Sequence, residues 1–84
     1  MINRYQAFDT GEEGLYIGIR GYYFNKWDAK EVYEKSLSSD EKDDSIMIEV
    51  GRKGSGTDTF ISIGVIEGEQ LALALLNLCN SIKG

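Results

Sequence analysis

The sequence of 84 residues contains no histidine, no proline and only one cysteine. Histidine is the commonest general base near neutral pH and the commonest metal ligand, so its absence removes the usual centre of both kinds of site. The absence of proline excludes a proline-rich ligand segment. A single cysteine cannot form an internal disulfide and fits a reducing compartment, which predicts a cytoplasmic protein.

Long apolar runs are also missing. No segment has the length and apolarity of a membrane span, and the first ten residues are polar, unlike a signal peptide. The length predicts a single domain over residues 1–84. Since a chain this short buries only about 60–65% of its unfolded surface, its core is thin. We therefore expect self-association, as a homodimer, to add stability.

Alternating apolar residues predict strands at about residues 2–8, 15–24, 45–52 and 59–66. Helical spacing predicts a charged helix that follows an N-cap at Asn25 and ends near Leu37, and a second helix over residues 69–82. The order β-β-α-β-β-α predicts an α+β fold, with a four-stranded, mostly antiparallel sheet and both helices packed on one face.

The second helix is the most apolar segment. Leu71, Leu75, Leu78, Cys79 and Ile82 share one stripe, which predicts that they are buried in a small core with Cys79 as an inert core residue.

Two large apolar residues lie outside the predicted core. Leu73 interrupts the polar side of the second helix and is a candidate contact for a second copy or another protein. Trp27 either folds over the start of the first helix as a hydrophobic staple or is exposed as a binding anchor.

The strand at 15–24 has two unlike faces. Leu15, Ile17 and Ile19 are predicted to face the core, as are Ile46, Ile48 and Val50 of the next strand. The opposite face is aromatic and basic, and the glycine-rich loop at 51–57 adds two cations. Such a face could stack unpaired bases, or it could be packed across strands or buried in a dimer. Its candidate nucleic-acid-binding residues are Tyr16, Arg20, Tyr22, Phe24, Arg52 and Lys53.

Three short segments resemble the PC4-type coactivators, which bind single-stranded DNA as dimers through a curved antiparallel sheet followed by a helix. The segments are 19–23 (IRGYY), 51–54 (GRKG) and 61–63 (ISI) leading to 68–70 (GEQ). They cover about a third of the chain, and a helix and an acidic loop separate the first two. The resemblance implies that Arg20, Tyr22, Arg52 and Lys53 contact DNA.

The net charge of −5 disfavours non-specific nucleic-acid binding and favours a basic protein partner. The acidic loop at 38–44 lacks the glycine and terminal glutamate of an EF-hand, so no metal or cofactor is predicted. The residues expected to form an acidic partner-binding surface, mimicking the phosphates of a nucleic acid, are Glu12, Glu13, Asp40, Glu41, Asp43 and Asp44.

No pair of acid–base groups is placed by the sequence to share a catalytic site, so we expect a protein that is not an enzyme. The predicted function is a small acidic protein-binding module, an inhibitor or adaptor similar in character to phage anti-defence proteins. It would occupy the basic surface of a nucleic-acid-handling protein. The alternative is a single-stranded nucleic-acid-binding domain that uses the aromatic and arginine face of the sheet.

Overall fold

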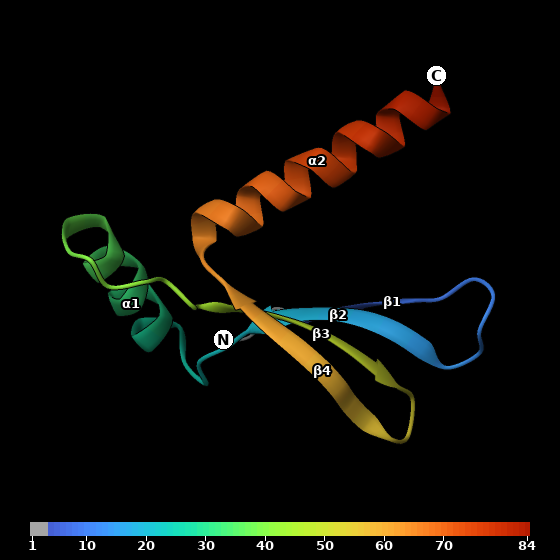
Figure 1. Cartoon of the computed structure of the whole chain (residues 1–84), viewed down its shortest axis with the longest axis horizontal. Helices are drawn as coiled ribbons and strands as arrows, with labels where there is room; N and C mark the ends of the chain where they lie inside the picture. Colours follow the sequence, from blue (N-terminus) through green and yellow to red (C-terminus); the bar gives the residue numbers. More distant parts are fainter. Residues whose placement is uncertain (1–3) are drawn as a thin grey trace.

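The computed structural model describes residues 4–84 and confirms the α+β class and the element order. Its four strands form an open antiparallel sheet whose spatial order follows the chain (Figure 1). Residues 2 and 3 of the first predicted strand lie outside the described residues. The elements are β1 (Tyr5–Phe8), β2 (Leu15–Gly21), α1 (Lys26–Ser38), β3 (Ile46–Arg52), β4 (Gly56–Ile63) and α2 (Val65–Lys83).

Several predicted boundaries move. The helix α2 begins at Val65 rather than near residue 69, and β2 ends at Gly21 rather than at residue 24. The glycine-rich segment is a tight hairpin turn and not a loop, because Gly54 and Gly56 adopt positive φ angles of 86° and 82°. This turn lets β4 begin at residue 56, three residues earlier than predicted.

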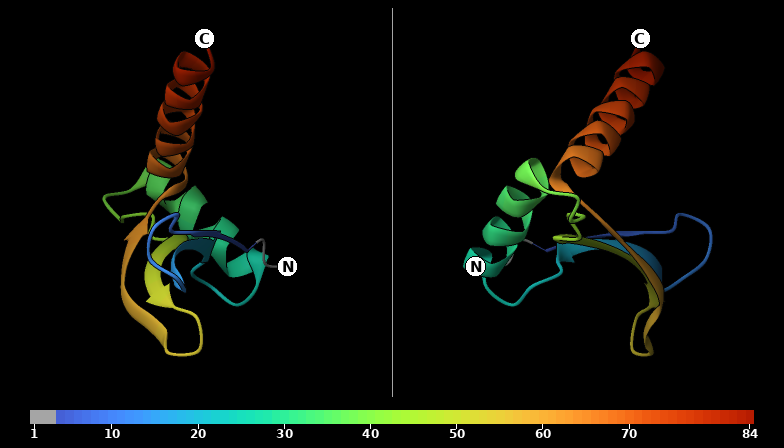
Figure 2. Two further views of the ribbon diagram at one scale, coloured as in Figure 1. Left: turned by 90° about the vertical axis from the view of Figure 1, so that its right-hand side faces the viewer. Right: turned by 60° about the vertical axis from the view of Figure 1, so that its left-hand side comes forward.

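The prediction of which sheet face is buried is wrong. Ile17 and Ile19 are 50% and 49% exposed, whereas Met47 and Glu49, predicted to face outward, are 6% and 3% exposed. We call the face that carries Tyr16, Arg20, Met47 and Glu49 the inner face, and the opposite face the isoleucine face. The sheet is strongly curved (Figure 2). The isoleucine face comprises Tyr5, Ala7, Leu15, Ile17, Ile19, Ile46, Ile48, Val50, Thr59, Ile61 and Ile63.

Glycines on β2 and β3 explain why the inner face is closely packed. Tyr16 lies opposite Gly51, and Gly18 lies opposite Glu49. A Cβ atom at Gly51 would lie 2.8 Å from the Tyr16 hydroxyl, and one at Gly18 would lie 3.2 Å from Cγ of Glu49. The large side chain in each pair therefore covers a glycine. A β-bulge beside Gly51 adds local twist.

Neither helix covers a face of the sheet in the way that was predicted. Neither α1 nor α2 contains a buried residue, and α2 extends away from the sheet (Figures 1 and 2). The protein is consequently extended, with a radius of gyration of 14.7 Å, compared with about 12 Å for a compact domain of this length. The core is even thinner than the chain length predicted, because α2 contributes no buried residue to it.

The helix α1 matches its prediction closely. Asn25 is the N-cap, and its side chain accepts a hydrogen bond from the backbone N–H of Asp28 at 3.0 Å. Glu31 and Lys35, four residues apart, form an ion pair at 3.1 Å. This contact raises the pKa of Lys35. One side of the helix is half-buried, at Ala29, Val32, Tyr33 and Ser36, whereas Leu37 is exposed.

Candidate interaction surfaces

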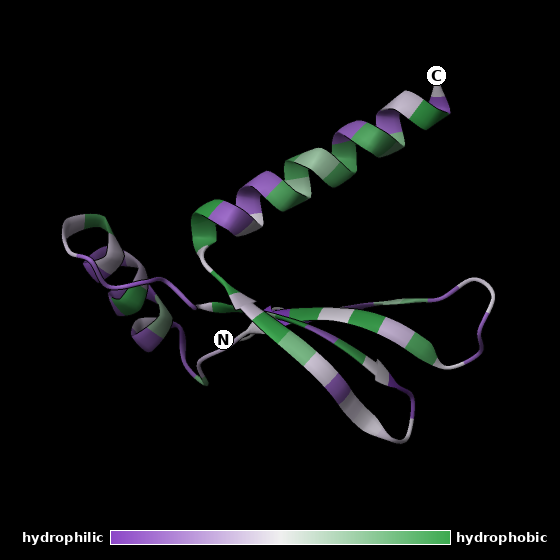
Figure 3. Ribbon diagram, in the orientation of Figure 1, coloured by the Kyte–Doolittle hydropathy of each residue, from purple (hydrophilic) through white to green (hydrophobic). Residues whose placement is uncertain are grey.

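An exposed apolar surface extends along α2. Apolar residues run along its whole length (Figure 3). The predicted stripe exists, but it is solvent-exposed instead of forming a core, and Leu73 on the other side is also 51% exposed. Cys79 is likewise exposed rather than buried. The exposed large side chains of this surface are Leu71, Leu75, Leu76, Leu78 and Ile82, each more than half exposed.

The start of α2 is held by the loop that precedes β3. The Asp43 carboxylate accepts hydrogen bonds from the backbone N–H of Val65 at 2.8 Å and from that of Ser45 at 3.0 Å. Because the N-cap residue Gly64 has no side chain, Asp43 takes the place of a normal N-cap acceptor. Glu67 completes the cap by accepting the N–H of Gly64 at 3.0 Å. These contacts fix the direction in which α2 leaves the sheet.

The inner face contains a buried acid. Glu49 lies 3.8 Å from Nε of Arg20 and accepts a hydrogen bond from the Thr57 hydroxyl. Nε of Arg20 is buried without a hydrogen bond to any residue of 4–84. The Arg20 side chain beside Glu49 is 38% exposed, whereas Tyr16 is only 8% exposed. Tyr16 is therefore packed across the strands, the alternative to an open, base-stacking face.

The six candidate nucleic-acid-binding residues are divided between the two ends of β2. Tyr16, Arg52 and Lys53 line one hollow at the hairpin end of the sheet, where Phe8 packs on Tyr16 with ring centroids 5.9 Å apart. The Arg52 guanidinium, however, pairs with Glu12 at 3.0 Å. Tyr22 and Phe24 lie beyond the other end of the strand, at Gly21.

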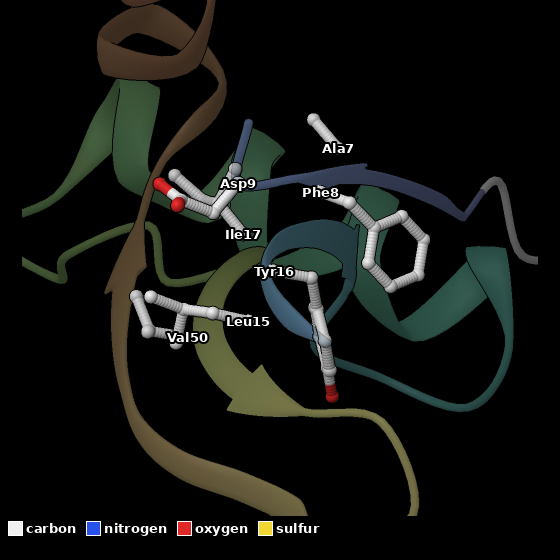
Figure 4. Close-up of a pocket in the computed structure, with 7 residues that line it drawn as sticks. All are labelled: Ala7, Phe8, Asp9, Leu15, Tyr16, Ile17 and Val50. Atoms are coloured by element: carbon white, nitrogen blue, oxygen red, sulfur yellow. The ribbon is translucent and has the colours of Figure 1, made fainter. Parts of the chain in front are cut away.

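A second hollow, of about 220 Å³, lies beside the edge strand β1 (Figure 4). Its wall is mostly apolar, from Ala7, Leu15, Ile17 and Val50. The one carboxylate in this hollow belongs to Asp9. It accepts hydrogen bonds from the backbone N–H groups of Glu12 and Gly11 in the β1–β2 turn, and these hydrogen bonds lower the pKa of Asp9. This hollow extends the isoleucine face and has no pair of groups suited to acid–base catalysis.

An aromatic and basic segment that the sequence analysis only partly identified joins β2 to α1. Phe24 is 88% exposed and Trp27 is 68% exposed, so the staple interpretation of Trp27 is wrong. Nζ of Lys26 and of Lys30 lie 5.6 Å and 5.9 Å from the Trp27 ring centroid. We call Tyr22, Phe24, Lys26, Trp27 and Lys30 the aromatic–lysine segment. The spacing of the two lysines around the tryptophan was the signal that could have identified it.

The six predicted acidic residues do not form one surface. Glu12 and Glu13 lie in the β1–β2 turn, and the others lie in the α1–β3 loop at the opposite side of the sheet (Figure 1). Asp43 caps α2, Glu12 pairs with Arg52, and Asp44 accepts a hydrogen bond from the Tyr23 hydroxyl at 2.7 Å. Glu13, Asp40 and Glu41 remain exposed without an ion pair among the described residues.

Within residues 4–84, histidine, cysteine, aspartate and glutamate side chains form no group of three suited to hold a metal ion. In the same part of the chain, no helix has both the length and the apolarity needed to cross a membrane. Comparisons with protein-family models, with curated proteins and with solved structures find no match to this chain. The proposed function therefore depends on the surfaces described above.

Proposed function

We propose that the protein is a non-enzymatic protein-binding module that works as a homodimer joined through α2. The observation that supports this is the apolar stripe of α2, whose leucine and isoleucine side chains are each more than half exposed. An exposed apolar patch of this extent is typical of a protein–protein contact. Because most helical stability in proteins comes from packing of an apolar face, we expect α2, a helix of 19 residues without a buried residue, to be stabilised by a partner.

The exposed area is sufficient for a large interface. The chain exposes 6593 Å², whereas a folded monomer of its mass is expected to expose about 5,000 Å². The excess of about 1,600 Å² is roughly twice the area that each partner buries in a standard interface. Completing the burial of each half-exposed Leu or Ile of α2 would contribute on the order of 1 kcal/mol.

A double substitution on the stripe tests the dimer. Leu71→Glu with Leu78→Glu places two charges on the contact and should convert a dimer to a monomer in sedimentation velocity. The matched control is Gln70→Glu with Asn77→Glu, which adds the same charges on the polar side of the same turns. Equal dissociation by both pairs, or by neither, would reject α2 as the contact.

We also propose that a basic protein partner binds the exposed acidic residues of the loop between α1 and β3. Asp40 and Glu41 are exposed and carry no structural hydrogen bond from another segment, so they are the acids available to such a partner. Binding of a basic test protein, such as a histone, should weaken in Asp40→Asn with Glu41→Gln. An unchanged affinity would remove the nucleic-acid-mimic interpretation.

The aromatic–lysine segment supports a second candidate function, the binding of single-stranded nucleic acid. Exposed aromatic rings stack on unpaired bases, and lysines beside them neutralise phosphates. Trp27 is the only tryptophan, so its fluorescence reports contact at this segment directly. Quenching by single-stranded DNA that weakens with salt, and weakens further in Lys26→Ala with Lys30→Ala but not in the control Lys42→Ala, would support this function. No quenching at low salt would exclude it.

A further inference from the structure

The apolar stripe of α2 has the pattern of a helix that packs on another helix. Gly68, Ala72, Leu75, Cys79 and Ile82 follow one another at alternating spacings of four and three residues, which is the core pattern of a two-helix contact. Leu71 and Leu78 flank this core on one side, and Glu69, Leu76 and Lys83 flank it on the other.

We propose that α2 pairs antiparallel with α2 of a second copy, with Glu69 of each chain facing Lys83 of the other. This proposal rests on the proposed dimer and adds its direction and register. Glu69 and Lys83 each lie seven residues from Leu76, on the same flank, so an antiparallel pair centred near Leu76 brings opposite charges together at both ends. In a parallel pair the flank of Glu69 and Lys83 would instead face the Leu71 and Leu78 flank of the second copy, so the two charges would have no charged partner there.

A register centred on residue 77, in which Glu69 and Lys83 are offset by two residues or about 3 Å along the axes, also matches side-chain sizes across the core. It sets Ala72 level with Ile82 of the second copy, a small residue against a large one, and sets Leu75 level with Cys79. In an antiparallel pair the dipoles of the two helices also point in opposite directions, which is favourable.

The N-terminal end of the stripe contacts the sheet of its own chain. A Cβ at Gly68 would lie 2.8 Å from Cδ1 of Ile46 and 3.9 Å from Cδ1 of Ile63, so Gly68 packs directly on the isoleucine face. The apolar stripe of α2 is therefore continuous with that face. In an antiparallel pair the C-terminal end of the second helix, with Ile82, comes to the corner where α2 leaves the sheet.

Disulfide mapping under mild oxidation tests the direction. In this antiparallel register the two native Cys79 residues are offset by about 6 Å along the helix axes. This offset adds to the separation between the two helices, and the resulting distance is beyond the reach of a disulfide. The native protein should therefore not cross-link. Leu75→Cys, with Cys79 retained, should give a covalent dimer, and Leu75→Cys with Cys79→Ser should not. Efficient cross-linking of the native protein would indicate a parallel pair and overturn the proposal.

Charge exchange gives an independent test. Glu69→Lys should raise the dissociation constant of the dimer about tenfold, because each dimer has two such pairs. Lys83→Glu should do the same, and the double variant should return close to the native value. The control Gln70→Lys adds a cation in the same turn, off the contact, and should change little. A native dimer without rescue in the double variant rejects the antiparallel register while leaving the proposed dimer intact; a native monomer rejects both.

Discussion

The Asp43 carboxylate accepts the backbone N–H of Val65 at 2.8 Å, across 22 residues of sequence. This contact makes the acidic loop before β3 the N-terminal cap of α2. It explains why one of the acids that the sequence assigned to a binding surface is part of the fold.

Asp43→Ala should therefore lower the free energy of unfolding by about 1–2 kcal/mol, the usual cost of losing an N-cap acceptor. Asp43→Asn keeps an acceptor oxygen and should cost less. Asp40→Ala, three residues away and exposed, is the control and should change stability by less than about 0.5 kcal/mol. Urea unfolding at one fixed protein concentration measures all three, and equal effects of Asp43→Ala and Asp40→Ala would contradict the capping role.

Gly64 is expected to tolerate no side chain, although its φ of −94° is ordinary. An added Cβ would lie 2.7 Å from Oε1 of Glu67 and 2.9 Å from the carbonyl oxygen of Asp43, so both capping contacts would have to move. Gly64→Ala should cost about 1–3 kcal/mol. The control Gly11→Ala places a Cβ no closer than 3.5 Å to any other group and should be nearly neutral. A thermal unfolding series in which both variants behave alike would show that the corner is not tightly packed.

The prediction of the fold succeeded where it depended on local pattern and failed where it depended on what covers a surface. The N-cap at Asn25 and the order of the helices and strands along the chain both follow from short-range spacing. In β3, however, Ile46, Ile48 and Val50 alternate with Met47 and Glu49, and nothing in this alternation says that Glu49 lies over Gly18. The pairing of Tyr16 with Gly51 that packs the inner face becomes visible only with the strand register.

The same limit applies to α2. Its apolar stripe was predicted correctly from periodicity, but periodicity does not distinguish a helix that packs on its own sheet from one that packs on a second chain. The candidate site was predicted only in part, because Arg20 and Arg52 were counted as available cations. In the structure each lies beside a carboxylate, Glu49 and Glu12 respectively.

Tyr23 should ionise unusually late. Its hydroxyl donates a hydrogen bond to the Asp44 carboxylate, which raises the pKa of Tyr23 to about 12. Because this value is above the ordinary tyrosine pKa of about 10, the stability that the contact contributes is complete below pH 10 and is lost as pH rises towards 12. An ultraviolet absorbance titration should show a late step that is absent in Tyr23→Phe and earlier in Asp44→Asn. A late step that survives in Tyr23→Phe would assign it to another tyrosine.

Gly51→Ala should disrupt the inner face. The added Cβ would lie 2.5 Å from the carbonyl oxygen of Gly56 and 2.8 Å from the Tyr16 hydroxyl, so the backbone of the β3–β4 hairpin would have to shift. We expect a loss of about 2 kcal/mol or more in unfolding free energy. Gly18→Ala meets side chains and no backbone, with Cγ of Glu49 at 3.2 Å and Cε1 of Tyr16 at 3.5 Å, and should cost less. The reverse order in chemical denaturation would contradict the packing described for Tyr16.

The proposed function requires that α2 be completed by a second copy of the chain. Sedimentation velocity of the native protein over a wide concentration range, with circular dichroism on the same samples, tests this requirement. We expect a species of twice 9.4 kDa, and a loss of helical signal when dilution dissociates it. A single species of 9.4 kDa that keeps its full helical signal at every concentration would exclude the dimer.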